Sequence, residues 1–113
     1  MTARPLSVSL EGPVFVFLWS VTGRAHAPGG EAIDLLGELR AALRKPVSIA
    51  VAASKQEGWS TRRYPFAFPG PDHVVMAWSL VNTLKAEGGE QVDAAYALRN
   101  ALRPLWRRVE EGD

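Results

Sequence analysis

The segment Gly58–Pro71 limits the possible folds of this 113-residue chain more than any other stretch. It holds four of the ten aromatic residues, beside an Arg pair, and Gly and Pro residues bound it. Proline cannot donate a hydrogen bond to a neighbouring strand, so Pro65 excludes this segment from the interior of a sheet. We therefore expect Trp59–Phe68 to form an extended strand at a sheet edge, with Tyr64, Phe66 and Phe68 on one face.

The N-terminal part of the chain predicts two strands. Apolar and polar residues alternate over Leu6–Leu10, which is the pattern of a half-exposed strand. A turn at Gly12-Pro13 follows. Val14–Val21 is then apolar on both faces, as is typical of a central strand that is covered on both sides. The two strands are expected to form a hairpin.

A helix and a further strand are predicted between Glu31 and Ala53. From Glu31 the apolar residues recur with a period of about 3.6, with acidic residues early and basic residues late, as the helix dipole favours. Pro46 is expected to end this helix. Val47–Ala53 predicts the next strand, and the parallel strands on either side of the helix should be joined by a right-handed crossover.

Two helices are expected after the aromatic segment. The first begins at Pro71, next to an acidic residue. In the second, apolar residues recur every three or four positions from Ala95 to Val109, and Pro104 should kink it. Residues 110–113 form an acidic, frayed tail.

These elements predict one compact α/β (α+β) domain over residues 1–109. The expected order is β-β-α-β-β-α-α, with a mixed sheet of about four strands and helices mainly on one face. Three helices are too few to cover both faces of such a sheet. We therefore expect a homodimer, formed through the uncovered sheet face or the edge at Tyr64–Phe68.

The composition narrows the functional classes. The chain has no Cys, which excludes disulfides, thiolate zinc sites and Cys nucleophiles. The formal net charge of +1 is too small for a general attraction to nucleic acid or anionic lipid. No apolar run approaches the ~20 residues that a membrane helix needs. We expect a bacterial cytoplasmic protein with no membrane partner, no metal and no cofactor.

The leading functional hypothesis is a small, non-catalytic protein-interaction or adaptor module. Aromatic and Arg side chains are enriched where protein surfaces meet, and the segment Gly58–Pro71 combines both. The candidate partner-binding residues are Trp59, Arg62, Arg63, Tyr64, Phe66 and Phe68. The alternative is that the rings fill the core of the protein and that the Arg pair is simply solvated.

The second hypothesis is an accessory nucleic-acid-binding protein. Arg99, Arg103 and Arg107 follow each other at four-residue spacing, and Arg108 lies beside them. Such a helical stripe could hold phosphates through bidentate pairing, while the rings of Gly58–Pro71 stacked on bases. The alternative is a solvated face whose positive charges suit a helix C-terminus.

Two weaker features concern anions and catalysis. Arg24 and His26 lie in a Gly-containing loop before a helix and could contact an anion, although the spacing matches no P-loop or dinucleotide pattern. An ordinary connection is the alternative.

A small enzyme is the third functional hypothesis. It would need His26 or His73 in a pocket with a carboxylate directed at the imidazole.

Overall fold

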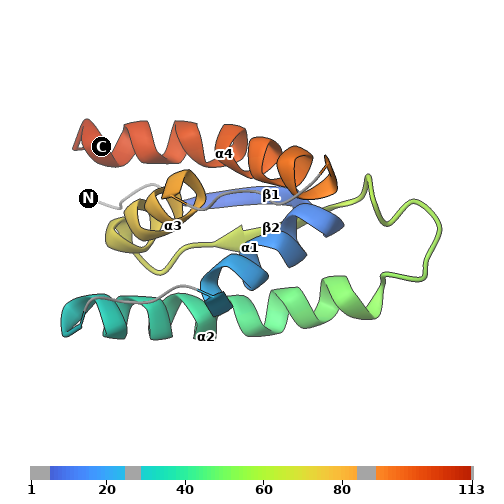
Figure 1. The fold of residues 1–113 in the computed structure, drawn as a ribbon, viewed down its shortest axis with the longest axis horizontal. Coiled ribbons are helices and arrows are strands. Elements are labelled where there is room, and N and C mark those ends of the chain that lie inside the picture. Colours follow the sequence, from blue (N-terminus) through green and yellow to red (C-terminus); the bar gives the residue numbers. More distant parts are fainter. Residues whose placement is uncertain (1–5, 25–28, 84–88, 113) are drawn as a thin grey trace.

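Four helices surround a two-stranded sheet in the computed structural model of this chain, which describes residues 6–24, 29–83 and 89–112. In chain order the elements are β1 (Ser7–Glu11), α1 (Gly12–Arg24), α2 (Glu31–Ala52), β2 (Arg63–Ala67), α3 (Pro71–Thr83) and α4 (Gly89–Glu110). Figure 1 shows the strands in the middle of the molecule, with α4 along one side and α2 along the other. The fold is therefore mainly helical.

The predicted four-stranded mixed sheet is wrong. Its place is taken by one antiparallel pair, in which Val8 of β1 lies opposite Phe66 of β2 and Leu10 lies opposite Tyr64. The order is β-α-α-β-α-α instead of β-β-α-β-β-α-α. The expected hairpin, the parallel pair and its crossover are therefore wrong as well.

The predicted central strand Val14–Val21 is part of helix α1. A run that is apolar on every side satisfies a buried helix as well as a buried strand, so its periodicity cannot separate the two. Pro13 suits the first turn of a helix, where its missing N–H is not needed, and the helix starts directly after β1. Phe15 and Leu18 of this helix are fully buried.

The predicted strand Val47–Ala53 is also wrong, because α2 continues through Pro46 to Ala52. The buried residues of the helix keep the same spacing across the proline: Leu39, Leu43, Val47 and Ala50. A proline inside a helix costs about 3 kcal/mol, whereas full burial of one Val contributes about 1.5–3 kcal/mol. The continued apolar stripe therefore offsets most of the cost of Pro46.

The predicted edge strand is confirmed only in its second half, as β2 (Arg63–Ala67), because Trp59–Thr61, which were expected to be extended, lie in turns. The Phe68 N–H donates to the directly opposite Leu6 carbonyl at 2.8 Å, so this pair is hydrogen-bonded. Because such pairs alternate with non-bonded ones, Pro65 and Ser9 form a non-hydrogen-bonded pair. The missing N–H of Pro65 therefore points away from β1, where no ladder bond is lost.

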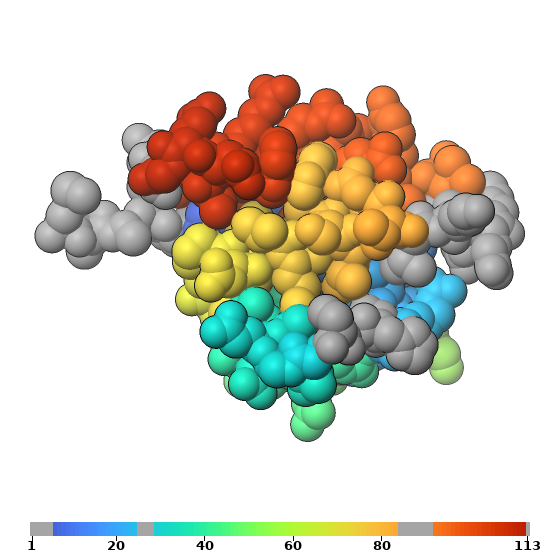
Figure 2. Space-filling model, turned by 60° about the vertical axis from the view of Figure 1, so that its left-hand side comes forward, coloured from blue at the N-terminus to red at the C-terminus, as the bar shows by residue number. Residues whose placement is uncertain are grey.

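The two C-terminal helices are confirmed, and they pack on each other. α3 begins at Pro71, and α4 continues through Pro104 with Leu102 fully buried. The Trp78 and Trp106 rings stack between them, with centroids 5.1 Å apart and an interplanar angle of 19°. In Figure 2, α3 lies between α4 and the first half of α2. No helix in the described part of the chain is long and apolar enough to cross a membrane.

Candidate functional site

The rings of the segment Gly58–Pro71 divide between the core and the surface. Phe66 and Phe68 are only 3% and 6% exposed. The Phe66 ring meets Phe15 and Phe68 edge-to-face, with centroid distances of 5.9 and 4.8 Å. These two candidate anchors therefore belong to the core and offer no surface to a partner.

Trp59 is half-buried and joins the loop after α2 to two helices. Its indole Nε1–H donates to the Ala50 carbonyl at 2.7 Å. The indole also covers the start of α1, since a Cβ added at Gly12 would lie 2.4 Å from Trp59 Cε2. Trp59 thus fixes the loop that leads into β2, and only part of its ring is open to a partner.

Tyr64 lies in an apolar groove between β2 and the C-terminal half of α2. The groove has a volume of about 190 Å³ and is lined by Lys45, Pro46, Ile49, Tyr64 and Pro65. Ile49 is 55% exposed, which is high for a large aliphatic residue. The Tyr64 hydroxyl is buried and has no hydrogen-bond partner within the described residues. The groove thus exposes apolar surface, and Ile49 is its large exposed hydrophobic side chain.

One cation, Lys45, lines this groove. Arg44, Arg62 and Arg63 are exposed and lie near its lining residues in the sequence. Arg62 donates to the Gln56 side-chain oxygen at 3.3 Å, and Arg63 donates to the Ser9 carbonyl at 3.4 Å. None of the four forms an ion pair with a carboxylate of the described residues. Lys45 is therefore the cation that the structure places at the groove.

The Arg stripe of α4 lies away from this groove. Arg103 and Arg107 are exposed, whereas Arg99 and Arg108 are half-buried. The stripe runs from the middle of α4 to its last turn, and within the described residues α4 packs against α1, α3 and β1 but not against β2. The loop between α2 and β2, which holds Trp59, lies near the opposite end of the molecule from the end of α4 (Figure 1). The structure therefore does not bring the stripe next to the rings that were expected to stack on bases.

The histidines offer no open catalytic base in the part of the chain that is described. His73 is only 7% exposed; its Nε2 lies 3.1 Å from Glu38 Oε2, while its Nδ1 is buried and makes no hydrogen bond there. A carboxylate is thus directed at the imidazole, as the enzyme hypothesis requires, but neither ring nitrogen faces a substrate. His26 lies outside the described residues.

Acidic side chains line a hollow of about 260 Å³ next to His73, between the first turns of α2 and α3. They are Glu31, Asp34, Glu38 and Asp72. Within the ranges that the structure describes, no group of three or more His, Asp or Glu is placed to hold a metal ion.

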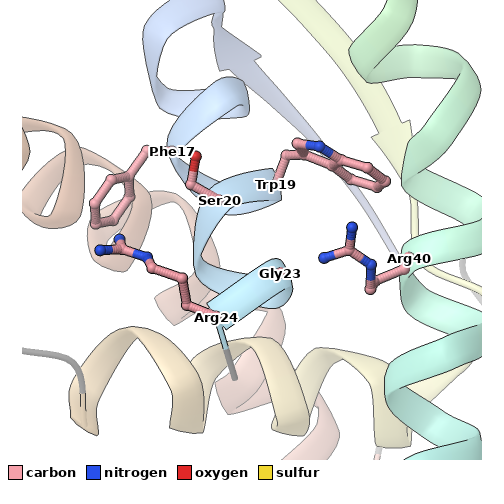
Figure 3. A pocket seen from close by; sticks show the side chains of 6 residues that line it. All are labelled: Phe17, Trp19, Ser20, Gly23, Arg24 and Arg40. Atoms are coloured by element: carbon pink, nitrogen blue, oxygen red, sulfur yellow. The ribbon is translucent and has the colours of Figure 1, made fainter. Parts of the chain in front are cut away.

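A third hollow lies beside the last turns of α1. It has a volume of about 440 Å³ and is lined by Phe17, Trp19, Ser20, Gly23, Arg24 and Arg40. Arg24 was expected in a loop, where it could contact an anion at the start of the following helix. The structure instead places Arg24 in the last turn of α1. In Figure 3, Arg24 lies beside Phe17, and Arg40 lies beside Trp19 on the other side of the hollow.

Sequence reasoning missed the residues that α2 contributes to the groove beside β2 and to the hollow beside the last turns of α1. Ile49 and Pro46 were assigned to a strand and to a helix end, so their place beside β2 was not foreseen. Arg40 was treated only as a favourable charge late in a helix. Its contact with Trp19 had no sequence signal, because it depends on how α1 packs on α2.

Comparison of this chain with known protein families, with curated proteins and with solved structures finds no match.

Proposed function

We propose that this protein is a non-catalytic interaction module that binds its partner in the groove between α2 and β2, here called the α2–β2 groove. The observation that carries the proposal is Ile49, which is 55% exposed in an apolar groove that Tyr64 also lines. Exposed apolar surface of this kind is costly in the free protein. A bound partner would remove that cost by covering Ile49.

The proposed occupant is a segment of another protein with an apolar anchor flanked by acidic residues. Apolar surface predominates in the groove, which suits one aliphatic or aromatic side chain. Lys45 suits a carboxylate beside that anchor, since it lines the groove and has no carboxylate partner among the described residues. Most affinity would come from the anchor, and the charges would set partner choice and association rate.

A partner that binds by adding a strand to the edge of β2 is less favoured by the structure. The outer edge of β2 lacks an N–H at Pro65, and α2 packs against this strand. The partner is therefore expected to bind mainly through side chains.

A homodimer remains a prediction, although its original reason no longer applies. That reason was an uncovered central strand at Val14–Val21, and this segment is a helix. A second copy is treated as an alternative occupant, and light scattering on the purified protein tests it.

A cytoplasmic location also stays part of the proposal, in agreement with the lack of cysteine.

The experiment is selection of displayed random peptides against the purified protein, followed by affinity measurement with three variants. Ile49→Glu places a charge in the groove. Val51→Glu is the matched control, because Val51 is also exposed, at 48%, and lies on the same helix without lining the groove. Selected peptides are expected to be acidic with one large apolar residue. They should bind at least about tenfold more weakly to Ile49→Glu and equally well to Val51→Glu.

Lys45→Glu is the third variant and tests the charge argument. It should weaken the same peptides and make their binding less sensitive to salt. Enriched peptides that bind Ile49→Glu and the unmodified protein equally would contradict the proposal. Failure to enrich any peptide, combined with a stable dimer in light scattering that Ile49→Glu dissociates, would instead assign the groove to a second copy.

A further inference from the structure

The hollow beside the last turns of α1 carries two cations and no acid in its lining. Arg24 comes from the end of α1 and Arg40 from the middle of α2. Figure 3 shows Ser20 and Gly23 on the α1 surface between them. The residues that line the α2–β2 groove are different ones, so this hollow is a separate feature of the surface.

Two contacts orient the guanidinium of Arg40. It lies over the Trp19 ring, with Cζ 4.2 Å from the ring centroid. Its Nη1 lies 3.4 Å from the hydroxyl oxygen of Thr22, a fully buried residue whose own hydroxyl donates to the Trp19 carbonyl at 2.8 Å. Gly23 leaves the space that the guanidinium fills, since a Cβ there would lie 2.7 Å from Arg40 Nη1. Arg40 is thus oriented before any ligand arrives.

Most hydrogen-bonding capacity of the two Arg side chains is unused. Within the described residues, Arg40 makes the single side-chain hydrogen bond to Thr22, and neither Arg24 nor Arg40 forms an ion pair with a carboxylate. A guanidinium presents a planar fork of donors that matches the oxygens of phosphate. A half-buried, oriented guanidinium without an acidic partner therefore favours an anionic ligand.

We propose that this hollow binds a small molecule that carries a phosphate group, with Arg40 as the fixed contact and Arg24 as the second cation. A phosphate monoester carries between one and two negative charges near neutral pH. It therefore matches the charge of two cations better than a carboxylate, which carries a single charge. Phe17 and Trp19 supply apolar walls for the organic part of the ligand. The volume of about 440 Å³ leaves room for that part.

The two Arg residues are not equal in this site. The end of α1 carries the negative pole of the helix dipole, which partly offsets the charge of Arg24 in the last turn. Arg40 lies in the interior of α2, where no helix end opposes it, and its orientation is already fixed. Loss of Arg40 should therefore weaken binding more than loss of Arg24.

The test is a titration of the isotopically labelled protein with inorganic phosphate and then with phenyl phosphate, at constant ionic strength, followed by NMR. Saturable shifts are expected at the Trp19 indole and the Gly23 amide. Phenyl phosphate should bind more tightly than inorganic phosphate, because its ring reaches the apolar walls. Arg40→Ala should weaken binding about tenfold or more, and Arg24→Ala by a smaller factor. Arg103→Ala, an exposed Arg of α4 outside this hollow, is the matched control and should bind as the unmodified protein does.

Arg40→Lys guards against a folding defect, because it keeps the charge and the side-chain stem but loses the planar fork. It should fold normally and bind with intermediate affinity. Three results would overturn the proposal. They are shifts that do not saturate, equal weakening by Arg40→Ala and Arg103→Ala, and phenyl phosphate that binds no more tightly than inorganic phosphate.

Discussion

Replacing Phe66 with Ala separates the two roles that the aromatic segment could have. Phe66 is 3% exposed and meets Phe15 and Phe68 edge-to-face. Removing a buried Phe side chain costs about 3–5 kcal/mol, and each such ring contact accounts for about 0.5–1.5 kcal/mol. Since small domains are stable by about 5–15 kcal/mol, Phe66→Ala should remove a large part of the free energy of unfolding. We expect a loss of about 4 kcal/mol.

Tyr64→Phe is the matched change on the neighbouring inward-facing position of the same strand. It removes only the buried hydroxyl, which has no hydrogen-bond partner within the described residues. Such a hydroxyl costs about 1–3 kcal/mol when buried unpaired, so the variant should be as stable as the unmodified protein or more stable.

Urea unfolding followed by circular dichroism measures both effects. The midpoint should fall strongly for Phe66→Ala and stay equal or rise for Tyr64→Phe, with little change in the slope of either transition. A loss below about 1 kcal/mol for Phe66→Ala would refute the reasoning, because no core Phe is removed so cheaply. It would return Phe66 to the set of exposed candidate anchors.

Two further substitutions test the local geometry. Gly12→Ala should destabilise the protein by about 1–2 kcal/mol although Ala favours helix by about 1 kcal/mol, because the added Cβ displaces the Trp59 indole and breaks its bond to Ala50. Calorimetry together with the NMR signal of the indole N–H checks this, and a stabilised variant with an unchanged indole signal would contradict it. Pro46→Ala should stabilise α2 by about 1–3 kcal/mol, because it restores a helical N–H in an unbroken helix. An unchanged melting temperature would instead fit a helix that ends at residue 45.

Local sequence rules succeeded where one residue permits few conformations. Pro65 tolerates an edge position and little else in a sheet, so the edge strand β2 followed from the sequence. The apolar spacing from Glu31 to Leu43 likewise fits a helix and does not fit a strand. The two C-terminal helices followed from the same spacing rule.

The same rules failed where a segment is apolar on every side. Val14–Val21 and Val47–Ala53 fit a buried strand and a buried helix equally well. Both were predicted as strands because the proline before each of them, Pro13 or Pro46, was interpreted as a turn or as the end of a helix. Pro13 suits a hairpin turn or a first helical turn, and Pro46 ends a helix unless burial beyond it offsets the cost. Tertiary packing made both segments helical, and with them the predicted sheet and its open face were lost.

The candidate sites could be predicted only in part, for a related reason. Tyr64 and Arg24 stood out in the sequence, and each lines one of the two proposed binding surfaces. Their partners Ile49 and Arg40 lie on α2, and only the packing of this helix on β2 and α1 brings them close. Burial of Phe66 and Phe68 was likewise a matter of which strand face meets the helices.

The location of the bound peptide tests the central claim most directly. The labelled protein is titrated with a selected acidic peptide, and the shifts of its amide and methyl signals are followed by NMR. Binding in the α2–β2 groove predicts saturable shifts at Lys45, Ile49 and Tyr64, with the second half of α4 unaffected. Shifts centred on Arg99, Arg103 and Arg107, with Ile49 unchanged, would contradict the account and assign binding to the Arg stripe of α4.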